Sequence, residues 1–306
     1  MIIRCYYIWP RFPSISLSGP HCAMSCAHCD QHYLSCMTTA TTPETLLSTA
    51  ESLESGGARG LLLSGGCDTQ GRMLNLPKLL PMIRRIKRET DLVIKLHTGL
   101  VDRELAEGIV SAEVDVASME FVGAKDSIRE VFGLPLDVNS YITTFRNLQD
   151  AGMPHISPHI CVGLQHGKLL GEFTALNLLK ETIDPESIAI IVFRPTKGTP
   201  MGDLPPPPPD SVGRVVAHAR KLFPMKKILL GSLRPRLSGK ENMIDGGKDS
   251  RLGIELAALN NGADAVEIPS PGMIRVMRDR GYRLKRIEAF GILPETYEER
   301  IGSSWM

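Results

Sequence analysis

The sequence predicts an α/β chain that folds as one TIM-type (β/α)₈ barrel with parallel strands and short extensions at both ends. Eight short runs rich in Val, Ile and Leu alternate with eight amphipathic segments, which is the order of elements in such a barrel. The length of 306 residues suits one barrel domain, and neither a shorter repeat nor a dividing linker interrupts the chain. We expect residues 1–14 to form an N-terminal extension, residues 15–281 the barrel, and residues 282–306 a tail that caps one end of it.

The expected strands are short and apolar, as parallel strands buried on both faces should be. They span Ile15–Ser18, Gly60–Ser64, Leu92–His97, Val114–Met119, His155–Val162, Ile188–Arg194, Lys226–Leu230 and Ala263–Ile268. The expected helices span Pro43–Ser55, Leu76–Glu89, Asp102–Val110, Asn139–Ala151, Leu169–Thr182, Asp210–Phe223, Ser250–Asn261 and Pro271–Arg280. The first of these helices follows Thr42, a good N-cap, and stops at Gly56-Gly57.

The bulk composition excludes several classes of partner. The formal net charge is +1 and charged residues make up 23% of the chain, so nothing favours a nucleic acid or an acidic membrane surface. No apolar run approaches the roughly 20 residues that span a bilayer. The first residues lack the apolar stretch and cleavage site of a signal peptide. We therefore expect a cytoplasmic protein.

Cysteine usage points to a metal site. The chain holds seven cysteines, and four of them lie between residues 22 and 36. In a cytoplasmic chain such a cluster favours metal binding over a disulfide framework. Cys22, Cys26 and Cys29 give the spacing C-x₃-C-x₂-C just after the first expected strand. Thiolates at this spacing on one loop can each bind one iron of a cubic [4Fe–4S] cluster.

Three cysteines leave the fourth iron of such a cluster without a protein ligand. A small molecule with an amine and a carboxylate can chelate that iron, and an electron from the cluster can then break a carbon–sulfur bond of an adjacent sulfonium. Two non-catalytic alternatives stay open. One is a cluster that only transfers electrons. The other is a structural zinc site completed by His21, His28 or His32, although zinc knots usually staple small domains rather than open a large barrel.

The motif and its place after the first strand resemble the radical S-adenosylmethionine (radical SAM) superfamily. The resemblance implies a radical SAM barrel, a [4Fe–4S] cluster, S-adenosylmethionine as cofactor, and its reductive cleavage to a 5′-deoxyadenosyl radical that abstracts hydrogen. His28 stands where the superfamily usually has an aromatic residue, and Ser64-Gly65-Gly66 matches the glycine motif that meets the methionine amine. The chain departs from that motif after the glycines, where Cys67 precedes Asp68.

Over most of residues 15–275 the chain resembles biotin synthases and their archaeal homologues. The likeness is carried by the cysteine motif, by Lys197-Gly198-Thr199-Pro200 after the sixth strand, and more weakly by Leu230–Arg234 at the exit of the seventh. It implies that Glu120, with Ser118 on the same strand, lies near the ribose or methionyl group of the cofactor. It also implies that Val162-Gly163 lies beside the adenine.

Biotin synthases hold a second iron–sulfur cluster as sulfur donor, and the chain has spare candidates for its ligands. The Ser-Ser pair near the end also resembles the ending of lipoyl synthases, where a serine ligates an auxiliary cluster. The candidates are Cys5, Cys36, Cys67, Cys161, Ser303 and Ser304. These hints imply sulfur insertion, as in biotin synthase or an archaeal two-component lipoyl synthase. A rival is a cofactor-maturation or carbon-skeleton enzyme without a sacrificial cluster, in which Cys161 simply packs in the core.

Chemistry in such barrels takes place at the carboxyl ends of the strands. Polar residues expected at this mouth to meet the substrate are His97, Arg194, Lys197 and Arg234. The substrate is expected to be a small molecule or a group bound to a carrier protein. The resemblance further implies an electron donor such as ferredoxin or flavodoxin, and a second radical SAM protein as partner in the lipoyl case.

Overall fold

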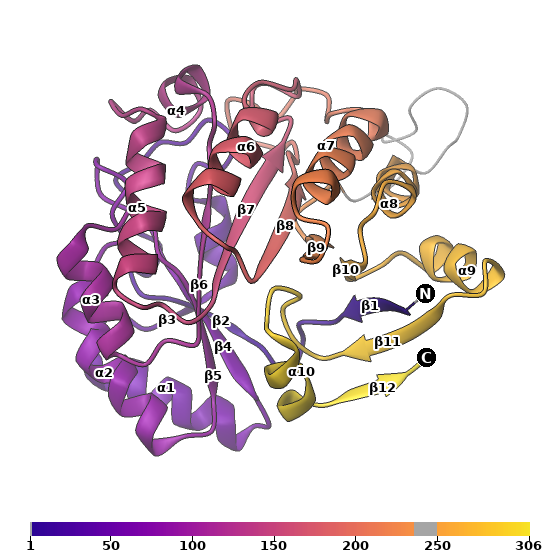
Figure 1. The fold of residues 1–306 in the computed structure, drawn as a ribbon. Helices are drawn as coiled ribbons and strands as arrows, with labels where there is room; N and C mark the ends of the chain where they lie inside the picture. Colours follow the sequence, from indigo (N-terminus) through magenta and orange to yellow (C-terminus); the bar gives the residue numbers. More distant parts are fainter. Residues whose placement is uncertain (1, 236–249) are drawn as a thin grey trace.

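The computed structural model describes residues 2–235 and 250–306. One curved sheet forms its body, in the order β12-β11-β1-β10-β9-β8-β7-β6-β5-β4-β2-β3 (Figure 1). The strands are β1 (Ile2–Tyr6), β2 (Ser14–Ser16), β3 (Thr38–Thr39), β4 (Gly60–Ser64), β5 (Val93–His97), β6 (Val116–Glu120), β7 (Ile156–Val162), β8 (Ser187–Val192), β9 (Lys227–Leu230), β10 (Ala265–Glu267), β11 (Arg283–Ile287) and β12 (Ser303–Trp305). Neighbouring strands pair in parallel, except that β12 runs antiparallel to β11.

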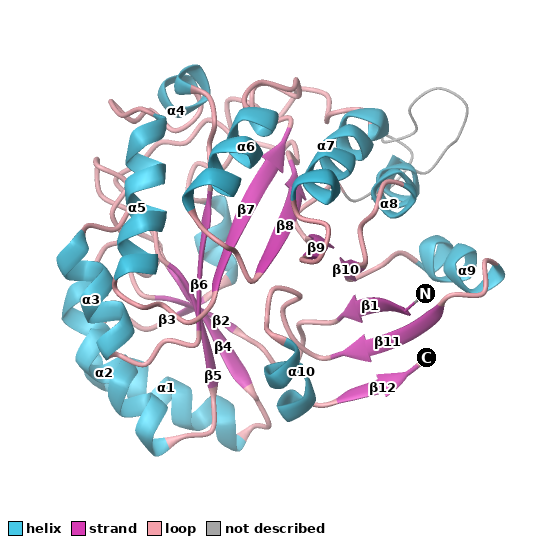
Figure 2. Ribbon diagram, viewed as in Figure 1, coloured by secondary structure: helices cyan, strands magenta, loops and turns pink. Residues whose placement is uncertain are grey.

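Helices alternate with the strands, and most of them cover the outer face of the curved sheet, whereas α10 (Glu295–Ile301) lies at its base (Figure 2). They are α1 (Pro43–Ser55), α2 (Leu76–Glu89), α3 (Arg103–Ser111), α4 (Lys125–Glu130), α5 (Val138–Asp150), α6 (Glu172–Thr182), α7 (Pro209–Leu222), α8 (Ser250–Asn260), α9 (Pro271–Asp279) and α10 (Glu295–Ile301). The Thr42 side chain caps α1 by accepting from the Thr45 N–H, as expected. None of the described helices combines the length and apolar character needed to cross a bilayer.

The prediction of a parallel α/β barrel-type fold is confirmed, but the sheet is an open half-barrel rather than a closed ring. Its two edges are short: β3 has 2 residues and β12 has 3. The sequence did not predict these two edge strands. It also did not predict β1 and β11, which pair with each other in register from Ile2–Arg283 to Tyr6–Ile287. Arg283, Lys285 and Arg286 on β11 obscure its apolar pattern.

Residues 289–293, here called the plug, close the inside of the half-barrel near the beginnings of the strands. The side chains of Phe290 and Ile292 pack with inward-facing Val93 and Val116, among others. The Ser157 and Ser187 hydroxyls, 3.2 and 3.3 Å away, both donate to the Ile292 carbonyl. The plug thus forms the floor of the half-barrel.

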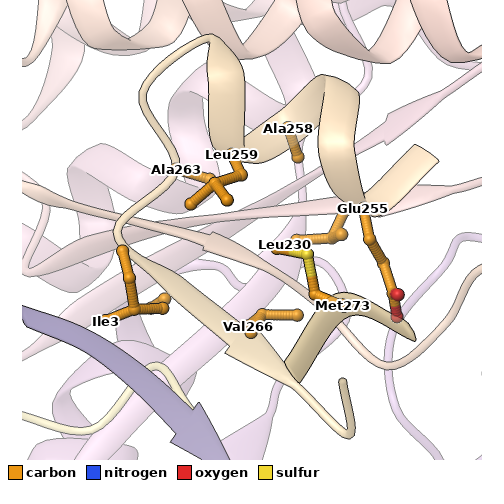
Figure 3. A pocket seen from close by; sticks show the side chains of 9 residues that line it. Ile3, Leu230, Glu255, Ala258, Leu259, Ala263, Val266 and Met273 are labelled. Carbon is orange, nitrogen blue, oxygen red and sulfur yellow. The ribbon is translucent and has the colours of Figure 1, made fainter. Parts of the chain in front are cut away.

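A second packing site lies outside the sheet, where α8 and α9 meet it (Figure 3). Ile3, Leu230, Val266 and Met273 converge there with other apolar side chains, and the Glu255 carboxylate lies at one side. The gap left between them is about 10 Å³, enough for one water molecule at most. This is a helix–sheet contact and not a ligand site.

Candidate functional site

The cysteine loop, residues 20–37, leaves the end of β2 and is anchored along its first half. Gly19 turns the chain with φ +62°, and its carbonyl accepts from the Ser16 hydroxyl at 2.6 Å. Further along, the Ala23 N–H donates to the Cys67 carbonyl and the Ala27 N–H to the Val131 carbonyl, each at 2.7 Å. These backbone bonds dock the loop over the carboxyl ends of the strands.

The three cysteines of the motif line one cavity together. Burial raises the pKa of Cys26, and the neighbouring Cys29 and Cys22 raise it further. Burial also raises the pKa of Cys29. A metal cation supplies the positive charge that such crowded thiolates need, so the donor set fits an iron–sulfur cluster. Within the described residues no three Cys, His, Asp or Glu side chains converge as ligands of a single metal ion, whereas a cubic cluster takes each thiolate on a different iron.

The glycine segment after β4 supports the loop directly. A Cβ on Gly66 would lie 2.1 Å from the His21 carbonyl oxygen and 2.5 Å from the Cys22 Cβ. The Gly66 N–H donates to the Ser18 hydroxyl at 2.7 Å, and the Cys67 N–H donates to the Cys22 Sγ at 3.2 Å. Gly66 therefore allows the two segments to touch, a role in addition to the close approach to a ligand expected from the sequence.

Glu120 is an acidic group whose charge acts on Cys26. Burial raises the pKa of Glu120 to about 7, and its Oε1 atom has no hydrogen-bond partner although the side chain lines the cavity. Cys161 hydrogen-bonds to Glu120. An unsatisfied buried acceptor is costly unless a ligand donates to it. A ribose hydroxyl or a methionyl amine would satisfy this oxygen, so the residue fits S-adenosylmethionine.

His28 lies beside the cluster cysteines in the loop. Its ring meets the edge of Phe132 with centroids 5.3 Å apart. Burial lowers its pKa to about 4, so the imidazole is neutral, and its Nδ1 atom is buried without a partner. The aromatic position expected here is thus filled by a neutral imidazole.

The cavity has a volume of about 720 Å³ and reaches from the cysteine loop to the plug. This is within the range of pockets that hold small molecules. Of the residues expected at the site, the structure brings together at its wall Cys22, Cys26, Cys29, His28, Cys36, Ser64, Gly65, Cys67, His97 and Glu120.

Three residues expected to contact substrate or cofactor lie elsewhere, and Arg234 requires a correction. Its side chain is 1% exposed, and its guanidinium donates to the Glu255 carboxylate at 2.7 Å and to the Gly231 carbonyl at 2.6 Å. It is an internal ion pair and not a residue of the mouth. The Gly163 N–H is already bonded to the Glu172 carboxylate at 2.8 Å, and Val162 before it is buried in the core.

The other expected residues are also spread over the fold. Cys5 is fully buried in β1, away from the cavity, and burial raises its pKa to about 12. Ser303 and Ser304 are exposed on β12 at the edge of the sheet. Ser118 is buried in β6, Arg194 is partly buried after β8, and Lys197 is exposed. The structure does not bring these residues to the cavity wall.

Lys95, Tyr141, His159 and Glu267 are among the residues of the cavity wall that the sequence did not predict for the site. Lys95 and His97 are two positions apart on β5, so both point inward. The His97 and His159 rings meet edge to face with centroids 5.4 Å apart. A lysine inside the apolar run VIKLH was the available signal, because only a residue facing a polar space is tolerated there.

Comparison with known proteins agrees with this geometry. The radical SAM superfamily pattern matches residues 16–166. Over 227 residues, or 70% of this chain and 65% of the relative, the sequence is 26% identical to the biotin synthase of Syntrophotalea carbinolica. It is 25% identical over 75% of this chain to that of Photobacterium profundum, of which it covers 64%. The chain thus spans just under two thirds of the length of these relatives.

Solved structures show the same fold at low sequence identity. The FeFe-hydrogenase maturase HydG from Carboxydothermus hydrogenoformans superposes with a TM-score of 0.63 and 15% identity over 98% of this chain and 70% of that one. Methylornithine synthase (PylB) superposes with a TM-score of 0.57 and 16% identity over 92% and 82%. With the cysteine loop, the glycine segment and the half-barrel in place, residues 16–166 match the radical SAM superfamily, and the chain is similar to biotin synthases.

Proposed function

We propose that this protein is an enzyme that binds a [4Fe–4S] cluster through Cys22, Cys26 and Cys29 and reductively cleaves S-adenosylmethionine. The observation that carries the proposal is the set of three thiols on one wall of a closed-bottomed cavity, beside an unsatisfied buried carboxylate oxygen. When bound, the cluster and the cofactor supply a carbon-centred radical that removes a hydrogen atom from the substrate.

The side chains of the chain itself bind, orient and shield. The three thiolates hold the cluster, and Glu120 accepts a hydrogen bond from the cofactor through its free Oε1 atom. The plug keeps water out from below, since Phe290 and Ile292 fill the bottom of the half-barrel.

The test is anaerobic reconstitution with iron and sulfide. We expect about four irons per chain for one cluster, and release of 5′-deoxyadenosine on addition of dithionite and S-adenosylmethionine. Cys26→Ala should lose both, whereas Cys5→Ala, which lies away from the cavity, should keep both. A colourless protein loaded with zinc would refute the proposal.

Sulfur insertion is a second candidate, favoured by two spare thiols on the same cavity wall, those of Cys36 and Cys67. A second cluster ligated there would act as sulfur donor, as in the biotin synthases to which the chain is similar. It requires clearly more than four irons per chain, and the excess should disappear in Cys36→Ala. An iron count of four in the wild type favours a reaction without a sacrificial cluster. In either case we propose that ferredoxin or flavodoxin supplies the electron.

A further inference from the structure

Lys95 is a buried cation that forms no ion pair with the described residues. Its side chain is 4% exposed and lies on the cavity wall, with its Nζ atom 4.1 Å from the centroid of the Phe290 ring of the plug. In the described part of the chain no carboxylate oxygen lies within 4.0 Å of this nitrogen, and no hydrogen bond from it is formed. A charge taken out of water in this way is costly unless something pairs with it.

Glu267 is the acidic group whose charge acts on Lys95, and each of its oxygens accepts a backbone N–H elsewhere. Its Oε2 atom accepts from the Ser232 N–H at 2.7 Å and its Oε1 atom accepts from the Gly291 N–H at 2.8 Å. Both oxygens therefore tie the plug and the end of β9 to β10. The Glu267 charge raises the pKa of Lys95, but burial is the larger effect and lowers it to about 8. The ammonium form still dominates at neutral pH.

Two imidazoles stand next to this cation on the same wall. His97 lies two residues beyond Lys95 on β5, and His159 lies on β7. Burial lowers the pKa of both rings, to about 4 for His97, and the Lys95 charge adds to the effect. Both rings are therefore neutral, and each can donate one N–H. One full positive charge with two neutral donors suits a singly charged carboxylate better than a doubly charged phosphate.

Lys95 lies deeper than the expected cofactor site, whereas His159 stands in register with Glu120 on the neighbouring strand. The cysteine loop and Glu120 lie at the carboxyl ends of the strands, whereas Lys95 lies in the middle of β5, about 7 Å deeper than His97. The surrounding wall includes the apolar side chains of Ala189, Leu229 and Ile292.

We propose that the substrate is a monocarboxylic acid with an apolar body, whose carboxylate pairs with Lys95 on the cavity floor while its other end points toward the cysteine loop. This inference rests on the proposed function, because it takes the cavity as the place where the substrate reacts. Lys95 then fixes which carbon of the substrate faces the radical source.

Calorimetric binding to the reconstituted protein, saturated with S-adenosylmethionine under anaerobic conditions, tests the inference. The probes are straight-chain monocarboxylates of increasing length, their primary amides and their primary amines. We expect at least one acid to bind, its amide to bind at least about 30-fold more weakly, and its amine not to bind. Failure of every acid to bind, or an amide or amine that binds as well as its acid, would overturn the inference.

Variants give an independent arm. Lys95→Met should weaken binding of the acid at least about 30-fold, and Lys95→Arg should restore most of it. Lys78→Met, an exposed lysine on α2, serves as the matched control and should bind like the wild type. Unchanged binding in Lys95→Met overturns the inference. A second outcome also overturns it: the variant binds the acid like the wild type but loses the iron that the wild type holds in excess of four per chain. That result would assign Lys95 to a second cluster.

The two proposals fail separately. The same preparation is assayed for iron and for 5′-deoxyadenosine. A preparation that carries the cluster and releases 5′-deoxyadenosine but binds no acid overturns the carboxylate anchor alone. A preparation without iron that still binds the acid through Lys95 overturns the proposed function, and the anion site then stands on its own.

Discussion

Lys95→Met should make the protein more stable at neutral pH. Burial lowers the pKa of Lys95 from 10.5 to about 8. Since one pKa unit corresponds to about 1.4 kcal/mol, holding the ammonium inside the fold costs about 3 kcal/mol. The substitution also removes the contact between the ammonium and the Phe290 ring, which stabilises the wild type by roughly 1 kcal/mol. We therefore expect the substitution to raise the free energy of unfolding by about 2 kcal/mol at pH 7.

The sign of the pH dependence gives a sharper test. Between about pH 8 and pH 10.5 the unfolded chain keeps the Lys95 proton while the folded chain has lost it. The wild type therefore gains stability from this group as the pH rises through that window. The methionine variant has no such gain, so its advantage is largest at pH 7 and shrinks toward pH 10.5.

Urea titrations of the cluster-free protein under reducing conditions measure both effects, at pH 7 and again near pH 10. Lys78→Met on the surface of α2 should differ from the wild type by no more than about 0.5 kcal/mol. If Lys95→Met is less stable than the wild type at pH 7, or if its advantage does not change with pH, then Lys95 is not a desolvated cation and the reasoning is wrong.

Three further predictions concern the loop, the carboxylate and the base of the fold. Gly66→Ala should lose most of the iron bound on reconstitution, whereas Gly65→Ala, whose added Cβ meets its nearest atoms at 3.3 Å, should keep most of it; equal iron contents would contradict this. Burial raises the pKa of Glu120 from 4.5 to about 7, so wild-type stability should fall by up to about 3 kcal/mol as the pH rises through this window. A Glu120→Gln variant should lack that fall in urea titrations, and a persistent fall would exclude Glu120 as its source. Glu298→Ala leaves the Lys227 ammonium, now 2.6 Å from that carboxylate, without its partner, and should lower the free energy of unfolding by about 3–5 kcal/mol in the same assay; a loss below 1 kcal/mol would refute the pairing.

The sequence was sufficient to predict those elements whose ends are determined by residues next to them in the chain. The helix Pro43–Ser55 and the strand Gly60–Ser64 match the structure to the residue, since a Thr42 cap and a glycine pair delimit them. Strand β11 was missed because charged side chains dominate it, and it becomes a strand only by pairing with β1. The sequence also could not predict that the barrel stays open, because this depends on which edge strands of the sheet pair with each other.

The same division holds for the site. The spacing of Cys22, Cys26 and Cys29 is written along a single loop, so the sequence sufficed to propose it. Arg234 was misread because an arginine after a strand looks the same in the sequence whether it meets substrate or an internal carboxylate, here that of Glu255 on the next helix. Lys95 was overlooked because the direction of a side chain inside an apolar strand follows from the strand pairing and not from composition.

The position of β1 has a consequence for how the chain is made. Arg4 pairs with Ala265 on one side and with Lys285 on the other, although these residues are synthesised more than 260 positions later. Strand β1 must therefore wait, with its apolar residues unpaired, until β10 and β11 have left the ribosome. Pairing between residues so far apart in the sequence slows folding, and the unpaired strand is prone to aggregation until its partners are made. Mutations that make residues 2–6 more apolar should lower the soluble yield more than they change the finished protein.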